Sequence, residues 1–383
     1  MEKLVKNIVK VGVEDKQIDL FEGMYKVPDG VTYNSYAVIG EKIAIIDSVD
    51  AHFSGEWLEN IDKSLGGESP DYLIIQHMEP DHSGSVNAFV EKYPDAVVVG
   101  NQKTFVMLSE YFGAGFPKNT LVVKDGETLD LGGRALKFIF APMVHWPEVM
   151  FTYDELSATL FSADAFGSFG INGDGWDDEA RRYYIGIVGK YGVQVTAALK
   201  KVLALNIQTV APLHGQTISG DKLAHAINLY SKWAGYQPET EGVLVAYSSV
   251  YGHTKAAANL LYSELNARGV EAKIVDLARD DWAECVAQAF KYSKLVVATT
   301  TYNAAIYPAA REFIDRLVER NYKNRTVAFI ENGTWAPVCA KLMRTQFEVC
   351  KDITFAQTTV KIHSALSDES RAEVIALAEE LSQ

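Results

Sequence analysis

The chain has 383 residues, of which 48% are apolar and 22% charged, and its formal net charge is −14. This length exceeds one ordinary hydrophobic core and predicts two domains, while the composition is that of a soluble globular protein. The acidic balance argues against nucleic acids and anionic membrane surfaces as partners, and the apolar runs are too short for a membrane helix.

The first half of the chain alternates short β-rich runs with turn or helical segments. The N-terminal stretch MEKLVKNIVKVGVED contains no apolar h-region, so no secretory signal is expected. The runs VTYNSYAVIG and KIAIID are joined at Gly40-Glu41, which predicts a hairpin, and YLIIQH, AVVVG and TLVV follow. Downstream, ALKFIFAP, ATLFSAD and TVAPLHG each end at or near a polar residue, and Glu179–Leu205 has helical spacing without proline. Strand pairs with intervening helices predict a mixed α/β sandwich more than a single parallel sheet.

Clustered metal ligands follow one of these apolar runs, Tyr72-Leu73-Ile74-Ile75. Four of the next residues, in the run HMEPDH, can ligate a metal, and three further candidates stand at the ends of later strands. The predicted ligands are His77, Glu79, Asp81, His82, His145, Asp164 and His214. A mixture of imidazoles and carboxylates suits a redox-capable metal such as iron better than a thiolate-preferring one. The set is large enough for two metal ions that share one carboxylate.

A linker is predicted at residues 235–242, which have glycine at both ends and one proline. It divides the chain into predicted domains at 1–238 and 242–383. After it, GVLVAYSS, EAKIVDL, KLVVATT and RTVAFIENG are continuous apolar runs of the parallel-strand kind, separated by helical segments. This rhythm predicts a doubly wound parallel sheet.

A phosphate-binding turn is predicted where the first strand of that sheet meets its helix. The run SSVYGHT follows VLVAY and places hydroxyl and backbone N–H groups at a helix N-terminus, which suits a monophosphate. Its spacing is that of the flavodoxin phosphate loop S/T-x-T-x-x-T, with Val250 in place of the middle threonine. Neither a Walker lysine nor G-x-G-x-x-G is present, which disfavours nucleoside triphosphates and dinucleotides. Two more loops follow later strands, and the predicted FMN-binding residues are Ser248, Ser249, Val250, Tyr251, Gly252, His253, Thr254, Thr301, Tyr302, Asn303, Ala304, Asn332, Gly333, Thr334, Trp335 and Ala336.

The cysteines exclude several kinds of site. Cys285, Cys339 and Cys350 lie far apart and form no C-x-x-C pair. This argues against a disulfide framework, a zinc ribbon and a rubredoxin-type iron centre within the chain. A reducing cytoplasm is the expected location.

Taken together, these motifs resemble a known family along essentially the whole chain. The first 240 residues or so are similar to a metallo-β-lactamase-like αββα sandwich, whose hydrolytic members carry H-x-H-x-D-H. This chain has H-x-E-x-D-H, and with the flavodoxin-like second half it resembles the flavodiiron proteins (A-type flavoproteins), in the form without a rubredoxin extension. The resemblance implies that His77, Glu79 and His145 bind one iron, that Asp81, His82 and His214 bind the other, and that Asp164 bridges them. Family members differ in whether the position of His82 coordinates, so that ligand stays open.

The resemblance also implies an activity. It predicts an FMN-dependent diiron oxidoreductase that reduces O2 to water, NO to N2O, or both, with electrons from an external donor such as a rubredoxin-like protein or a reduced deazaflavin. It predicts a head-to-tail homodimer or a dimer of dimers, because within one chain of the family the flavin and the irons lie too far apart. Tyr25 and Tyr191 resemble family tyrosines that line the gas pocket. Preference between O2 and NO, and the identity of the donor, are not predicted.

Two other functions remain as alternatives. One is a zinc hydrolase fused to a flavodoxin-like module, and the other is a redox sensor or electron-transfer protein with a vestigial metal site. Glu79 argues against the first, because a second carboxylate favours the ferric state and a hydrolytic zinc site needs only a water of lowered pKa. The complete set of ligands argues against the second.

Overall fold

The chain folds into two compact units, which are taken one at a time. The computed structural model describes residues 3–5 and 7–383. The first unit runs to Tyr184 and includes Tyr191–Ser231, and the second holds Ile185–Lys190 and Lys232–Gln383. These limits differ from the predicted domains in two short segments, 185–190 and 232–238.

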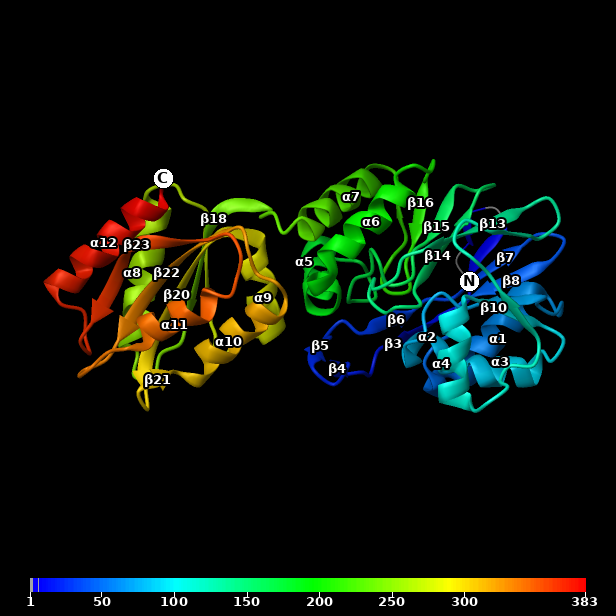
Figure 1. Ribbon diagram of the computed structural model, residues 1–383, viewed down its shortest axis with the longest axis horizontal. Helices are drawn as coiled ribbons and strands as arrows, with labels where there is room; N and C mark the ends of the chain where they lie inside the picture. The colour runs from blue at the N-terminus through cyan, green and yellow to red at the C-terminus, as the bar shows by residue number, and fades with distance from the viewer. Residues whose placement is uncertain (1–2, 6) are drawn as a thin grey trace. The chain divides into compact units, whose positions relative to one another are not determined.

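Two mixed sheets form the centre of the first unit (Figure 1). One sheet has the strand order β1 (Lys3–Val5), β2 (Ile8–Lys10), β7 (Tyr36–Ile39), β8 (Ile43–Ile46), β9 (Tyr72–Ile74), β10 (Val97–Gly100), β11 (Thr120–Val122). The other has the order β12 (Thr128–Asp130), β13 (Ala135–Phe140), β14 (Met150–Asp154), β15 (Thr159–Phe161), β16 (Thr209–Ala211), β17 (Ile218–Ser219). Small two-stranded pairs are formed by β3 (Val13–Asp15) with β6 (Val31–Tyr33) and by β4 (Leu20–Phe21) with β5 (Tyr25–Lys26).

The core of this unit lies between the two sheets. Buried side chains from one sheet, such as Val38 and Ile46, share a cluster with Phe138 and Phe161 of the other. Helices cover the outer faces; they are α1 (Ser54–Leu65), α2 (Pro80–Ser83), α3 (Val86–Lys92), α4 (Gln102–Phe112), α5 (Trp176–Tyr183), α6 (Gly192–Val202) and α7 (Asp221–Ala234). This confirms the predicted αββα sandwich.

One predicted strand is divided between two sheets. The run VTYNSYAVIG forms β6, which pairs with β3, and β7, which pairs with β8 through the predicted hairpin. Asn34 separates them: its Nδ2 donates to Pro212 O at 2.8 Å and to Gly215 O at 2.9 Å, across the sandwich. The chain therefore bends where a polar side chain must reach partners far away in the sequence.

The predicted helical stretch Glu179–Leu205 is interrupted. Helix α5 ends at Tyr183, a π-helical turn covers Tyr184–Val188, a 3-10 turn covers Gly189–Tyr191, and α6 begins at Gly192. Backbone carbonyls of the interruption bond to the second unit's own side chains, since Arg320 Nε donates to Ile185 O at 3.1 Å and Nη2 to Gly186 O at 3.3 Å. The helical periodicity of the sequence does not show that Arg320 will donate hydrogen bonds to these carbonyl groups.

The second unit is a doubly wound parallel sheet. Its strand order is β19 (Ala272–Asp276), β18 (Thr240–Tyr247), β20 (Tyr292–Tyr302), β22 (Arg325–Asn332), β23 (Ile353–Ile362), with the short β21 (Ala305–Ile306) beside β20. The order 2-1-3-4-5 is that of flavodoxins. The five main strands pair in parallel, as predicted from their continuous apolar runs.

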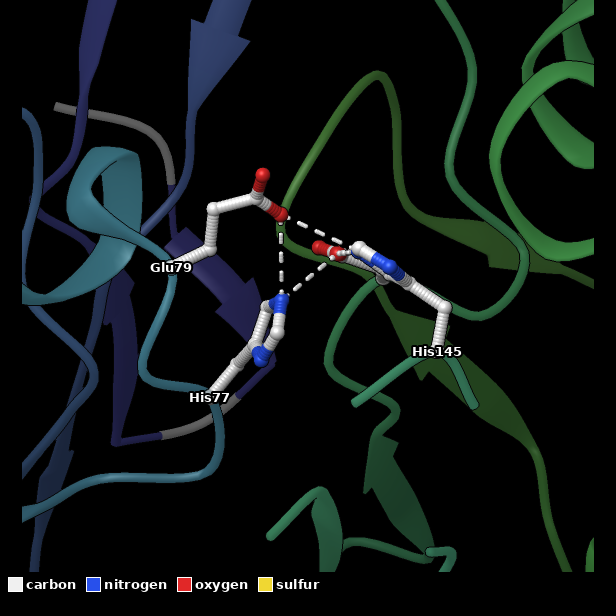
Figure 2. Close-up of side chains that lie close together, drawn as sticks. His77, Glu79 and His145 are labelled. Carbon is white, nitrogen blue, oxygen red and sulfur yellow. Dashed lines mark hydrogen bonds and ion pairs between the residues drawn. The ribbon is translucent and has the colours of Figure 1, made fainter. Parts of the chain in front are cut away.

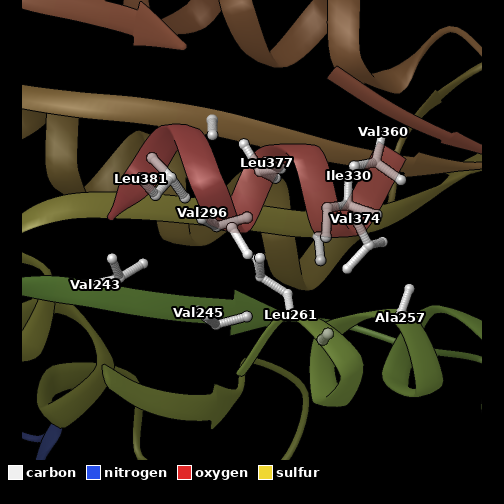
Figure 3. Packing of buried hydrophobic residues seen from close by; sticks show 14 of the residues in the cluster. Val243, Val245, Ala257, Leu261, Val296, Ile330, Val360, Val374, Leu377 and Leu381 are labelled. Atoms are coloured by element: carbon white, nitrogen blue, oxygen red, sulfur yellow. The ribbon is translucent and has the colours of Figure 1, made fainter. Parts of the chain in front are cut away.

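Helices pack on both faces of this sheet: α8 (His253–Ala267), α9 (Trp282–Lys291), α10 (Pro308–Glu319), α11 (Cys339–Phe347) and α12 (Asp368–Leu381). Figure 3 shows one face, where Leu261 of α8 and Leu377 of α12 meet Val245, Val296 and Ile330 of the strands. All are fully buried. The fold class predicted from the sequence is thus confirmed in both units.

None of the helices in the described residues combines the length and apolar character that crossing a bilayer requires.

Candidate functional site

The seven predicted metal ligands all stand at strand ends of the first unit. The run from His77 to His82 follows β9 and includes the single turn α2. His145 follows β13, Asp164 follows β15, and His214 follows β16. The side chains therefore come from both sheets and meet at one end of the sandwich.

Two imidazoles and two carboxylates form the first cluster (Figure 2). The Nε2 atom of His145 lies 3.0 Å from Glu79 Oε2 and 3.2 Å from Asp164 Oδ2. The Nε2 atom of His77 lies 3.3 Å from each of the same two oxygens. We name His77, Glu79, His145 and Asp164 Oδ2 the first metal position.

Asp81, His82 and His214 form the second cluster. Asp81 Oδ2 lies 3.2 Å from Nε2 of each of the two histidines, whose Nε2 atoms are 3.0 Å apart. Asp164 Oδ1 lies 3.2 Å from His82 Nε2 and 3.7 Å from His214 Nε2. We name Asp81, His82, His214 and Asp164 Oδ1 the second metal position. Each oxygen of Asp164 thus faces a different position, as a bridging carboxylate would.

Hydrogen bonds to the Nδ1 atoms of two histidines decide which nitrogen of each ring is left to bind a metal. His77 Nδ1 lies 2.8 Å from Glu148 Oε1, and His214 Nδ1 lies 2.7 Å from Thr32 O. Both partners are acceptors, so each Nδ1 carries a proton and Nε2 is the nitrogen available to bind a metal. This is the arrangement of a metal-binding histidine.

The electrostatics show how strongly the cluster depends on positive charge. Burial acts to raise the pKa of Asp164, but the neighbouring His77 and His82 lower it well below its usual range. Burial acts to lower the pKa of His145, but hydrogen bonds to Asp164 and Glu79 raise it to about 9. The Asp164 carboxylate is thus held ionised by the positive charge of the neighbouring histidines.

These donors fit two metal cations. Three carboxylates lie in one cluster, Asp164 fully buried and Glu79 and Asp81 mostly so. Both oxygens of Asp81 and Oδ1 of Asp164 are buried without a hydrogen-bond partner in the described structure. Carboxylates this close together repel one another unless positive charge, from protonated histidines or from metal ions, lies between them. The ligands, all imidazole or carboxylate, suit iron.

The loops that carry the ligands are themselves fixed by hydrogen bonds. Asp47 Oδ1 accepts Gln76 N at 2.7 Å and His77 N at 3.2 Å, and burial raises the pKa of Asp47 to about 6. After His214, Gly215 has φ +78°, and a Cβ there would lie 2.3 Å from Ser168 Oγ. Only glycine can make this turn without moving its neighbours.

The tyrosine nearest the cluster is one that the sequence did not single out. The Tyr183 ring lies 5.4 Å from the His214 ring. Burial, together with the negative charges of Asp164 and Asp81, raises the pKa of Tyr183 well above its usual range. Of the two predicted pocket tyrosines, Tyr25 is buried against Phe169, and Tyr191 is half-buried at the start of α6. Their predicted role in the pocket stays a prediction.

A cavity of about 740 Å³ lies at the strand ends of the second unit. Thr300 and Ser364, which were not predicted, line it together with the predicted Ser249, Val250, Tyr251, His253, Thr254, Thr301, Tyr302, Asn303, Ala304, Asn332, Gly333, Thr334, Trp335 and Ala336. The predicted Ser248 and Gly252 are not among the lining residues. Ser248 is fully buried, and its hydroxyl lies 2.7 Å from Thr299 Oγ1.

The rim of this cavity is held together by its own hydrogen bonds. Asn332 Nδ2 donates to Ser364 O at 2.9 Å, and Ser364 N donates back to Asn332 Oδ1 at 3.1 Å. Thr334 Oγ1 lies 2.6 Å from Ser364 Oγ. The loop at Ser364 therefore forms a fourth wall of the cavity, because β23, which precedes this loop, lies beside β22.

The chemistry of the lining fits FMN. Helix α8 begins after Gly252, which offers no side-chain cap, and its first turn contains no acidic residue, so its backbone N–H groups can bind a phosphate. The lining residues named above include none that is acidic. Hydroxyls and amides suit a ribityl chain, and the exposed rings of Tyr251, Tyr302 and Trp335 offer faces to a flavin ring.

Two protein families match the two halves of the chain. Residues 31–215 match the ODP family beta lactamase, and residues 244–349 match the flavodoxin domain. A protein of Moorella thermoacetica named nitric oxide reductase is 31% identical over 89% of this chain and 88% of its own length. A protein of Salmonella arizonae named anaerobic nitric oxide reductase flavorubredoxin is 30% identical over 91% of this chain and 75% of its own.

Two solved structures superimpose on essentially the whole chain. The flavodiiron protein from Giardia intestinalis superimposes with a TM-score of 0.92 at 25% identity, over 99% of this chain and 96% of that one. The rubredoxin oxygen:oxidoreductase of Desulfovibrio gigas superimposes with a TM-score of 0.92 at 24% identity, over 100% and 97%. At 24% identity, the match to the Desulfovibrio gigas structure shows that the two chains share a fold.

Proposed function

Because the chain belongs to the flavodiiron protein family, we propose that it is an FMN-dependent diiron oxidoreductase that reduces O2 to water, NO to N2O, or both. The observation that carries the proposal is the pair of metal positions joined by Asp164, whose two oxygens face different histidine pairs. A hydrolytic zinc site has no use for the additional carboxylate of Glu79, whereas a redox centre gains access to its oxidised state.

Each group of residues has a distinct task. His77, Glu79 and His145 would hold one iron, Asp81, His82 and His214 the other, and Asp164 both. When bound, the flavin and the irons supply the electrons and the binding site for the diatomic gas. The ligands are fully or mostly buried, which limits the access of bulk water, and Tyr183, whose ring lies against that of His214, is a phenolic O–H donor beside them.

Anaerobic stopped-flow tests this function. The protein, assayed for iron and FMN and fully reduced, is mixed separately with O2 and with NO. Fast reoxidation by either gas, at about two irons and one FMN per chain, is expected and would also identify the preferred substrate. Slow reoxidation by both gases, with zinc or no metal present, would refute the proposal in favour of a hydrolase or a sensor.

Tyr183→Phe is expected to lower the rate of gas reduction by about 10- to 100-fold, because one O–H donor in a charged pocket is lost. The matched variant Tyr191→Phe tests the sequence prediction at that position and is expected to change the rate by less than about twofold. Single-turnover reoxidation rates at equal iron content measure both. A larger loss of rate in Tyr191→Phe than in Tyr183→Phe would identify Tyr191 as the tyrosine that acts in gas reduction.

The flavin site has its own test. Ser249→Ala combined with Thr254→Ala should weaken FMN binding by about 10- to 100-fold, because two hydroxyls that line the cavity at the start of α8 are lost. FMN and iron contents of the purified protein measure this, with iron expected to stay unchanged. Thr345→Ala, on the exposed side of α11, is the control. Full FMN content in the Ser249/Thr254 variant would mean that the phosphate binds elsewhere. Ser248→Ala tests separately the phosphate contact that the sequence predicted for Ser248.

We extend the proposal to an external electron donor, either a rubredoxin-like protein or a reduced deazaflavin. Its support is that Cys285, Cys339 and Cys350 are unpaired and far apart in the sequence, so they form no iron–sulfur centre. Free thiols also support a reducing, cytoplasmic location. Reduction rates measured with each purified donor test the external donor, and failure of both donors would refute it. Fractionation of the native cells tests the cytoplasmic location.

We also propose a head-to-tail homodimer, or a dimer of such dimers, in which one subunit's flavin serves the other's irons. Its support is family membership and the exposure of Tyr251 (88%) and Trp335 (82%) at the flavin cavity, which a partner would cover. Activity per chain is expected to fall on dilution below the dissociation constant of the dimer. A fully active monomer would contradict it.

A further inference from the structure

The two metal positions have the same kinds of direct ligand but different surroundings. Each position has two imidazoles, one terminal carboxylate and one oxygen of Asp164. By ligand type alone the two positions would bind a metal with similar strength. Any difference between them must come from the groups behind the ligands.

Behind His77 stands a carboxylate. Glu148 Oε1 lies 2.8 Å from His77 Nδ1 and also accepts Met78 N at 2.8 Å, and Glu148 and His77 are both fully buried. The other oxygen, Oε2, has no hydrogen-bond partner in the described part of the chain. The charge of Glu148 is therefore directed at the His77 ring, in surroundings that screen it little.

In the described residues no carboxylate is hydrogen-bonded to Nδ1 of either histidine of the second position, although the buried Asp47 carboxylate lies close enough to interact with the charge of His82. His214 Nδ1 donates to the backbone carbonyl of Thr32 at 2.7 Å, which is a neutral acceptor. His82 Nδ1 is buried without a hydrogen-bond partner among the residues that the structure describes. A carboxylate hydrogen-bonded directly to a ligand ring, Glu148 on His77, is thus found at the first position and not at the second among the described residues.

We propose that Glu148 is a positioning residue that makes the two metal positions unequal, so that the first binds a metal more tightly and, as iron, has the lower reduction potential. A carboxylate that accepts the Nδ1 proton raises the basicity of Nε2 and fixes the plane of the ring. The added negative charge stabilises ferric more than ferrous iron, which lowers the potential. Glu148 acts through His77 and touches no substrate. The inference rests on the proposed function only where it concerns iron redox.

Cobalt(II) tests the affinity without redox chemistry. The metal-free protein is titrated with Co(II) and followed by its visible absorption, in a His214→Ala background that leaves the first position and a His145→Ala background that leaves the second. In the first background, Glu148→Ala is expected to weaken binding by about 100-fold and Glu148→Gln by about tenfold. Gln retains an acceptor for both N–H groups and loses only the charge. In the second background, both substitutions are expected to leave Co(II) binding unchanged.

A potential measurement separates the charge from a structural role. In the iron- and FMN-loaded protein, Glu148→Gln should raise the potential of one iron couple and leave the flavin couples unchanged. A tenfold preferential loss of ferric over ferrous binding corresponds to about 59 mV for one electron. Equal Co(II) binding and an unmoved potential in Glu148→Gln would overturn the proposal, even if Glu148→Ala binds weakly, because only a structural role would then remain. Wild-type protein that binds two metals but does not reduce O2 or NO would refute the proposed function instead.

Discussion

Replacing Asp164 by alanine is expected to abolish gas reduction while leaving the flavin bound. Its Oδ2 lies within 3.3 Å of the Nε2 atoms of His77 and His145, and its Oδ1 lies 3.2 Å from that of His82. Loss of this carboxylate removes a ligand from both positions and the negative charge that separates two cations. Because removing even an outer partner of a ligand costs 10- to 100-fold in metal affinity, loss of the bridge should cost more than about 100-fold.

Metal analysis, flavin absorbance and single-turnover reoxidation of the purified variant test this prediction together. Iron should fall below about one equivalent per chain while FMN stays near one, because the flavin cavity belongs to the other unit. Asp164→Asn keeps the shape without the charge and should fall between wild type and Asp164→Ala. Asp174→Ala, an exposed carboxylate of the same unit, is the control. Turnover retained in Asp164→Ala at full iron content would contradict the bridging role.

The second large effect is expected at a buried ion pair of the first unit. Arg134 Nε donates to Asp154 Oδ1 at 3.0 Å and Nη2 to Oδ2 at 2.6 Å, with both side chains buried. Arg134 Nη1 also donates to Asn7 O and Ile39 O, each at 3.3 Å, so the guanidinium connects the two sheets of the sandwich. Arg134→Met leaves the Asp154 carboxylate buried without its cation and should lower the free energy of unfolding by about 3–5 kcal/mol.

Urea unfolding followed by circular dichroism measures this loss. Lys201→Met is the matched control, because its ion pair with Asp125 is exposed and should contribute less than about 1 kcal/mol. The double variant Arg134→Met with Asp154→Leu should recover part of the loss, since an apolar pair no longer buries a lone charge. Equal destabilisation by the Arg134 and Lys201 variants would show that the buried pair contributes no more than an exposed one.

Strand-end chemistry explains why the sequence was informative about the metal site. An apolar run such as Tyr72–Ile75 is a buried strand whatever surrounds it, so the polar residues after it must emerge at the edge of a sheet. Four such edges carry imidazole or carboxylate side chains, and residue type alone predicts the metal. In the second half, continuous apolar runs and alternating helices likewise determine a parallel sheet through local periodicity.

Which of these residues share a position, and what stands behind them, was decided only by the tertiary structure. Glu148 reaches His77 across 71 residues, and Thr32 reaches His214 across 182. The ring of Tyr183 lies 5.4 Å from that of His214, a contact that the sequence did not indicate. No local pattern contains such pairings, because they arise from the stacking of two sheets.

The same limit applies to backbone breaks and to the walls of the flavin cavity. Val31–Ile39 reads as one strand, yet Asn34 divides it to reach carbonyls some 180 residues away. Ser364 lines the flavin cavity only because β23 lies beside β22. Local periodicity and strand-end chemistry thus determined the fold class and the predicted ligands. Contacts between distant residues decided how those ligands divide into two positions and which buried charge makes the positions unequal, because such contacts exist only once the sheets have packed.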